Sequence, residues 1–172
     1  MKVDPFETLG LPRNYDVDLA AVEKTHRELS RALHPDKFIG SGASERRAAL
    51  SKAVEVNEAW RVVRDPIRRA EALLTLAGVA LGEERANPTD PEFLMEMLEQ
   101  REALAEAKQA KDLARVHEMA RAIEGRTRAV EAGLGEGFAR GEAASLVARL
   151  GELRFYRRFL DEVSAIEDEL AA

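Results

Sequence analysis

Apolar positions recur every three or four residues along almost the whole chain, which is the spacing of one face of an α-helix. Asp4-Pro5 predicts a short first helix that ends at Gly10. A second helix is expected over residues 18–33, capped by Asp16 or Asp18, because aspartate is a favourable N-cap. The apolar side of this second helix consists of Val22, His26, Leu29 and Leu33. No strand pattern appears anywhere, so the sequence predicts an all-α protein.

Two more helices are expected in the first half of the chain. Proline disfavours the α region for the residue before it, so Pro35 should end the second helix near His34. Ser44 is expected to cap a long helix over about 44–64. A further helix, 66–78, opens on a proline, which suits the first turn. These four helices form a predicted N-terminal unit.

The second half has the pattern of a helical bundle that follows a linker. Residues 78–89 contain closely spaced glycine, asparagine and proline residues and predict the linker. Asp90-Pro91 opens a helix that runs to about residue 109. The next helix is expected over 111–133, and the glycines of 133–141 place the following turn there. The apolar stripe of the last helix consists of Leu146, Leu150, Leu153, Tyr156, Leu160, Val163 and Leu170. The second half therefore predicts an antiparallel three-helix bundle.

Charge differs between the two halves. Residues 1–77 carry 13 Lys/Arg against 12 Asp/Glu, a net +1, and residues 78–172 carry 13 against 20, a net −7. An acidic half argues against a nucleic-acid partner, whose phosphates need a basic surface. The absence of cysteine excludes disulfides, thiolate zinc sites and a cysteine nucleophile. No apolar stretch has signal-peptide or membrane-spanning length, so a cytoplasmic protein without a membrane partner is expected.

The loop after the second helix contains the tripeptide His34-Pro35-Asp36, followed by Lys37. An exposed imidazole and carboxylate, held apart by a rigid proline, would form a fixed polar hook. The alternatives are an ordinary turn in which Asp36 acts as a cap, or a hydrolase in which His34 is the base and Asp36 orients it. No nucleophile, oxyanion site or phosphate loop completes such an enzyme. Of the other histidines, His26 is expected to be half-buried in the core and His117 to lie on a helix surface, so no metal site is predicted.

The second helix carries a basic stripe opposite its apolar side. Lys24, Arg27 and Arg31 fall about 140–200° from Val22 at about 100° per residue. Such a stripe gives electrostatic steering towards an acidic partner through contacts that are individually weak. The alternative is an ordinary solvated helix face.

The helix after Asp90 carries two apolar faces. Phe93, Met97 and Leu104 form one of them. The other consists of Leu94, Met95 and Leu98, continued by Glu99, Glu102 and Glu106. Phe155 lies about 200° from Leu153 at helical spacing, off the leucine stripe. One face can pack the core, and the other would be an exposed patch of the kind that marks a binding site. The alternative is a wide core face packed against the N-terminal unit.

Several motifs, in order along nearly the whole chain, resemble those of the HscB family, the J-domain co-chaperones of iron–sulfur cluster assembly. The motifs are His34-Pro35-Asp36-Lys37-Phe38, Asn57-Glu58-Ala59-Trp60, Pro66-Ile67-Arg68-Arg69-Ala70-Glu71, Phe93-Leu94-Met95-Glu96 with Leu98-Glu99, and Leu153-Arg154-Phe155. The resemblance implies a J-domain over 1–77, which is an antiparallel helix hairpin with short flanking helices. It also implies a linker over 78–89 and a three-helix bundle over 90–172, in an L-shaped arrangement.

The same resemblance implies a regulator without a cofactor and without enzymatic activity of its own. Its partners would be the scaffold protein IscU, bound by the bundle, and the DnaK-type chaperone HscA, whose ATPase the J-domain stimulates. The implied chaperone-binding residues are Lys24, Arg27, Arg31, His34, Pro35, Asp36 and Lys37. The implied scaffold-binding residues are Leu94, Met95, Leu98, Glu99, Glu102, Glu106 and Phe155. A J-domain protein that serves a different client remains the alternative.

Overall fold

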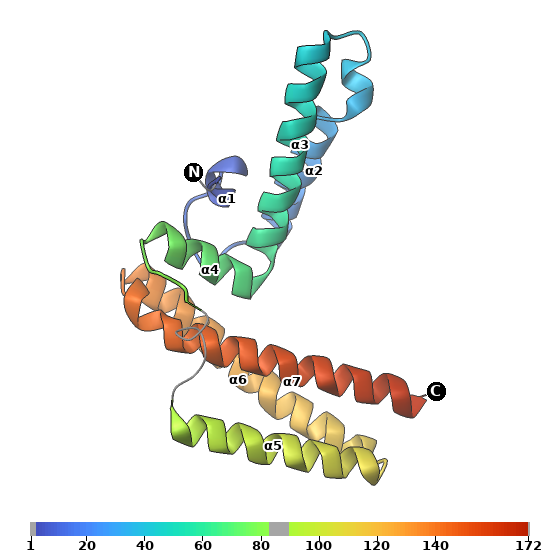
Figure 1. Cartoon of the computed structure of the whole chain (residues 1–172), viewed down its shortest axis with the longest axis vertical. Coiled ribbons are helices and arrows are strands. Elements are labelled where there is room, and N and C mark those ends of the chain that lie inside the picture. Colours follow the sequence, from blue (N-terminus) through green and yellow to red (C-terminus); the bar gives the residue numbers. More distant parts are fainter. Residues whose placement is uncertain (1–2, 83–89, 172) are drawn as a thin grey trace. The chain divides into compact units, whose positions relative to one another are not determined.

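The computed structural model describes residues 3–82 and 90–171, and all regular structure within these ranges is helical (Figure 1). The all-α prediction is therefore confirmed. The chain divides into two compact units, Met1–Val79 and Ala80–Ala172. Most of the predicted linker, residues 83–89, lies outside the described residues. Each unit has its own core, as expected of separate domains.

The N-terminal unit is built on two long helices. Its elements are α1 (Pro5–Thr8), α2 (Leu19–Ala32), the 3₁₀ turn η1 (Pro35–Phe38), α3 (Ala43–Arg64) and α4 (Pro66–Leu76). Helices α2 and α3 lie side by side as a hairpin, with η1 in the connection at one end and α1 packed on α3 (Figure 1). Phe6, Val22, Val56, Val63 and Leu74 are almost completely buried. The predicted hairpin with short flanking helices is present.

Caps fix where these helices begin. Of the two candidates for α2, Asp18 is the cap, because its Oδ1 accepts from the backbone N–H of Ala20 at 3.0 Å. The prediction that Ser44 caps α3 is wrong. Gly42 is the N-cap and no side chain bonds there, so Ser44 lies inside the first turn. The extended conformation needed at an N-cap falls on Gly42, two residues before Ser44.

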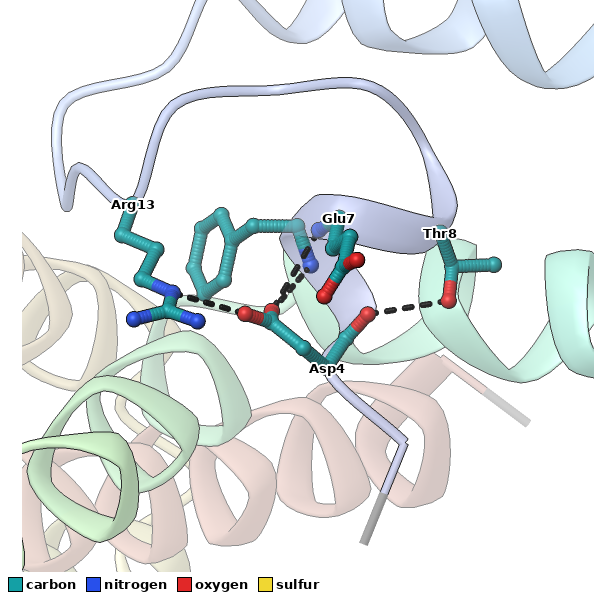
Figure 2. Close-up of polar contacts among 5 residues, drawn as sticks. Asp4, Glu7, Thr8 and Arg13 are labelled. Carbon is teal, nitrogen blue, oxygen red and sulfur yellow. Dashed lines mark hydrogen bonds and ion pairs between the residues drawn. The ribbon is translucent and has the colours of Figure 1, made fainter.

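Asp4 fixes the start of the first helix and ties it to the loop that follows (Figure 2). Its carboxylate accepts from the backbone N–H groups of Phe6 at 2.9 Å and Glu7 at 3.3 Å, and from Arg13 Nε at 2.7 Å. Burial opposes ionisation, but the Arg13 bond and the two backbone donors outweigh it, so the pKa of Asp4 is lowered. Thr8 Oγ1 also donates to the Asp4 carbonyl at 2.9 Å.

The C-terminal unit is a three-helix bundle. Its elements are α5 (Pro91–Gln109), α6 (Leu113–Ala139), the 3₁₀ turn η2 (Ala143–Leu146) and α7 (Val147–Ala171) (Figure 1). Arg101 contacts Glu162 at 3.1 Å and Lys108 contacts Glu169 at 2.6 Å, so α5 and α7 run in the same direction. His117 contacts Glu167 at 3.0 Å, whereas Gly137, near the other end of α6, lies against Leu146, so α6 runs opposite to α7. The predicted bundle is therefore confirmed.

The sixth helix is longer than the sequence predicts. It continues through the glycines of 133–141 and ends at Ala139, with the turn at Gly141, whose φ of +73° suits glycine. A β-carbon on Gly133 would meet the Arg149 guanidinium, and one on Gly137 would meet the Leu146 side chain. These two glycines thus allow close packing inside a helix and do not form a turn.

The buried stripe of α7 also differs in part from the prediction. Leu146, Leu150, Leu153, Tyr156 and Val163 are buried as expected. Phe159 and Ile166 complete the stripe, whereas Leu160 and Leu170 are only partly buried. The contact face continues from Tyr156 through Phe159, Val163 and Ile166 at spacings of three, four and three residues, which leaves Leu160 beside it.

Candidate functional site

The His34-Pro35-Asp36 motif forms a compact turn on the surface of the N-terminal unit. His34 is the N-cap of η1, and its Nδ1 accepts from the Asp36 backbone N–H at 3.3 Å. The Asp36 carboxylate lies 3.5 Å from the same nitrogen, so the prediction that proline holds the two groups apart is wrong. The turn folds Asp36 back over the imidazole. The two side chains are still 59% and 79% exposed, so both can reach a partner.

The basic stripe leads directly into this turn. Lys24, Arg27 and Arg31 are exposed on α2, and Lys37 is exposed within η1. Arg27 lies 3.6 Å from Glu23, a surface contact that contributes little in water. The structure therefore brings all the predicted chaperone-binding residues onto one continuous segment, from α2 to η1.

The remaining histidines lie as predicted, His26 half-buried and His117 on a helix surface, and each also makes a contact within the protein. His26 is half-buried; its ring stacks on Trp60 with centroids 5.2 Å apart, and its Nε2 lies 2.9 Å from Asn57 Oδ1. It thereby joins α2 to α3. His117 is exposed on α6 beside Glu167. Within the described ranges, no cluster of His, Asp and Glu side chains could hold a metal ion.

Helix α5 has the two apolar faces that its sequence predicts. Met97 and Leu104 are completely buried in the bundle, and Phe93 is partly buried. On the other face Leu94, Met95 and Leu98 are 42%, 59% and 52% exposed. Glu99, Glu102 and Glu106 are exposed on the same helix. The second apolar face is therefore not part of the core, and it forms an exposed patch fringed by carboxylates.

Phe155 of α7 contacts the first turn of α5. Its ring meets the Phe93 ring edge-on, with centroids 5.7 Å apart and planes at 82°. It is partly buried, whereas Leu153 and Tyr156 beside it in the sequence are buried, which confirms that Phe155 lies off the core stripe. Phe93 directly precedes Leu94, so Phe155 lies at the turn of α5 where the exposed face begins. We call Leu94, Met95, Leu98 and Phe155 the apolar patch.

A polar network between the helices of the bundle was not predicted from the sequence. Arg126 of α6 donates to Glu96 of α5, and this bond raises the pKa of the guanidinium. Burial raises the pKa of the Tyr156 hydroxyl. Burial also raises the pKa of Glu152, against the opposing effect of Arg149. These residues come from three different helices, so no local sequence pattern reveals the network, which fixes the relative positions of the helices that carry the patch.

Comparison with known proteins covers both units. Residues 4–72 match the DnaJ domain model and residues 89–164 match the model of the HSCB C-terminal oligomerisation domain. Two curated relatives are "Co-chaperone protein HscB homolog" of Cupriavidus taiwanensis and of Shewanella halifaxensis. The first is 35% identical over 170 residues, covering 99% of this chain and 97% of its own length. The second is 35% identical over 169 residues, and the match covers 96% of this chain and 97% of the relative.

Solved structures agree with these sequence matches. "Chaperone HscB from Vibrio cholerae" has a TM-score of 0.87 and 30% identity, covering 98% of this chain and 99% of its own. The structure of the human co-chaperone protein HscB also has a TM-score of 0.87, and the match covers 96% of this chain and 83% of the human one. At 23% identity, this likeness shows a shared fold.

The comparisons fix the class of the protein more firmly than any single motif. In the described part of the chain, no helix is long and apolar enough to cross a bilayer. A DnaJ domain acts on a DnaK-type chaperone, so a chaperone of that type is a partner. The match at 35% identity extends through both units. The chain belongs to the HscB family of J-domain co-chaperones.

Proposed function

We propose that this co-chaperone binds the iron–sulfur scaffold protein IscU through the apolar patch and delivers it to the DnaK-type chaperone HscA, whose ATPase it stimulates. The observation that carries the proposal is the exposed second face of α5 in a chain whose other unit is a J-domain. The protein would act in iron–sulfur cluster assembly or transfer and would carry out no bond-breaking step itself.

The patch has the properties of a binding surface for a protein partner. Three large apolar side chains are exposed within five positions of one helix, although the opposite face of that helix already fills the core. Burying such a side chain contributes about 1.5–3 kcal/mol. Phe155 adds an aromatic anchor, and interfaces depend on a few anchors of this kind. Glu99, Glu102 and Glu106 around the patch favour a partner with basic residues at its rim.

The chaperone side has a different character. The exposed His34 and Asp36 side chains and the cations of α2 offer hydrogen bonds and charge, with no apolar anchor among them. Exposed charge pairs are each worth about 0–1 kcal/mol and are screened by salt. Such a contact forms fast and dissociates fast. This suits a regulator that acts on many chaperone molecules in succession.

Purified components test the proposal directly. The ATP turnover of HscA should rise more with this chain and IscU together than with either protein alone. No additional stimulation by the pair would disprove the proposal. Stimulation of HscA by the chain alone, unchanged by IscU, would favour the alternative of a J-domain co-chaperone with a different client.

A further inference from the structure

Arg158 stands over the aromatic ring of the apolar patch. Its guanidinium carbon lies 5.2 Å from the centroid of the Phe155 ring, and the residue is exposed on α7. Within the described residues its side chain forms no hydrogen bond and no ion pair. The ring of Phe155 is in T-shaped contact with Phe93 and has a cation above its face. An exposed cation–π contact of this kind contributes only about 0.5–1 kcal/mol and leaves the N–H donors of the guanidinium available.

Arg158 is not paired with Glu162 in the structure. Glu162 is four residues further along α7, where it would be the natural helical partner of Arg158. Arg101 of α5 instead donates to Glu162 Oε2 through Nε at 3.2 Å and Nη2 at 3.1 Å. Glu162 is thus engaged in an interhelical bridge, and the Arg158 guanidinium lies over Phe155.

A free guanidinium at this place limits what can dock on Phe155. A partner that covers the ring must also remove water from Arg158, and an unpaired charge buried in an interface costs several kcal/mol. The cost disappears if the partner supplies a carboxylate, which matches the planar, two-pronged donor set of arginine. The carboxylates of Glu99, Glu102 and Glu106 on α5 instead favour a basic group on the partner. The patch therefore has acidic residues on α5 and a cation on α7.

We infer that Arg158 is a specificity residue of the scaffold-binding surface, which pairs with a carboxylate of the docked scaffold protein and fixes its orientation on the patch. The inference rests on the proposed function, because it assumes that the scaffold protein docks on this patch. It adds a charge requirement on the partner: apolar side chains in the centre, a basic group towards α5 and an acidic group towards α7. A partner docked in the reverse orientation would place like charges opposite each other at both edges.

Three substitutions at one position separate charge from packing. Purified IscU is titrated into the full-length chain carrying Arg158→Lys, Arg158→Gln or Arg158→Glu, and into the unchanged chain, by calorimetry at low and at high salt. We expect Arg158→Lys to bind within about threefold of the unchanged chain, because the charge stays and only the planar geometry is lost. Arg158→Gln should bind more weakly, and Arg158→Glu more weakly still, by about tenfold or more at low salt. High salt should narrow the difference between the Gln and Glu variants.

Two further variants make the outcome unambiguous. Arg121→Glu changes an exposed arginine of α6 and alters the net charge as much as Arg158→Glu does. This control variant should bind IscU as tightly as the unchanged chain. Leu98→Ala removes an exposed member of the patch and reports on the patch itself. Equal binding by the Gln and Glu variants would reduce Arg158 to a packing role and overturn the inference. If Leu98→Ala weakens binding and no Arg158 variant does, the inference fails and the proposed function stands. If the unchanged chain does not bind IscU, both fail.

Discussion

The turn at His34 and the patch on α5 are both exposed, but they differ in the physics of the contacts that they can make. The turn offers an imidazole and a carboxylate that already lie 3.5 Å apart, beside a helix with a basic stripe. The patch offers three apolar side chains and an aromatic ring on helices whose opposite faces are buried. Polar contacts in water yield little net free energy and are screened by salt, whereas apolar burial is largely insensitive to salt. One chain can therefore hold one partner stably while it touches the other only briefly.

The largest effect should come from the turn. We expect His34→Gln to abolish the stimulation of the chaperone ATPase, because glutamine lacks the imidazole and its cap on the Asp36 N–H. IscU affinity should stay within about twofold of the unchanged chain, since the patch and the turn belong to separate compact units. ATP turnover and calorimetry with the same protein preparation measure the two quantities.

His117→Gln is the matched control for that substitution. His117 is also exposed and also contacts a carboxylate, that of Glu167, but it lies in the bundle and far along the chain from the turn. It should leave both stimulation and IscU affinity unchanged. If His34→Gln weakened scaffold binding as much as stimulation, the division of labour between the two faces would be wrong.

The patch should give the next largest effect. Leu94→Ala combined with Phe155→Ala should weaken IscU binding by about 1–3 kcal/mol for each well-buried anchor. The chain's own fold should change little, because Leu94 is 42% exposed and Phe155 is only partly buried. Calorimetry gives the affinity, and circular dichroism checks that helix content is retained.

Leu113→Ala serves as the control for the apolar substitutions. Leu113 is exposed at the start of α6 and is not a member of the patch. IscU affinity should be the same as for the unchanged chain. An equal loss in the control and in the patch variants would mean that general surface hydrophobicity, and not this patch, accounts for binding.

The stability of the bundle that carries the patch depends on one glycine more than on the others. Gly137→Ala would push a β-carbon against the buried Leu146 side chain, and such overpacking costs about 1–3 kcal/mol. Gly125→Ala, in the same helix but with open space around it, should gain up to about 1 kcal/mol of helix propensity. Hydrogen exchange of α6 amides during a urea series measures both variants. Equal effects of the two substitutions would contradict the packing role of Gly137.

The same glycines show where prediction from the sequence stops. N-cap residues allowed the beginnings of several helices to be predicted from the local sequence. Asp4-Pro5, Asp18 and Asp90-Pro91 each start the helix that was predicted there. Gly133 and Gly137 carry the same local signal as turn glycines, and only the approach of Arg149 and Leu146 from the next helix explains them.

The candidate site also contains some features that could be predicted from one segment and others that could not. The exposure of Leu94 and Leu98 follows from helical geometry within one segment, and it was predicted from their spacing on a helix whose other face is apolar. The Glu96–Arg126 pair and the Arg101–Glu162 bridge depend on which helices meet, and in which direction. Such contacts join residues that are far apart in the chain, so they have no local pattern.

Salt should distinguish the turn at His34 from the apolar patch, with smaller changes in stimulation and affinity than the substitutions cause. Raising the salt from about 0.05 to 0.5 M shortens the Debye length and should reduce the stimulation of the chaperone several-fold. IscU affinity should change less, because apolar contacts dominate that surface. ATPase assays at saturating IscU isolate the first effect, and calorimetry without the chaperone isolates the second. If both quantities fell in parallel with salt, the contrast between a charged face and an apolar face would not hold.

The smallest effect concerns the acid sensitivity of the N-terminal unit. The pKa of Asp4 is lowered in the folded chain, so its charge stabilises the fold above the ordinary carboxyl pKa, and this contribution is lost as the pH falls through the folded value. Asp4→Asn keeps a side chain that can cap α1 but removes the ion pair with Arg13, so it should cost about 0.3–1 kcal/mol at neutral pH. The difference between Asp4→Asn and the unchanged chain should shrink towards zero in acid, where Asp4 itself becomes neutral. Urea denaturation across pH 2 to 7, followed at Trp60 in α3, measures it, and a difference independent of pH would show that the Arg13 pair does not stabilise this unit.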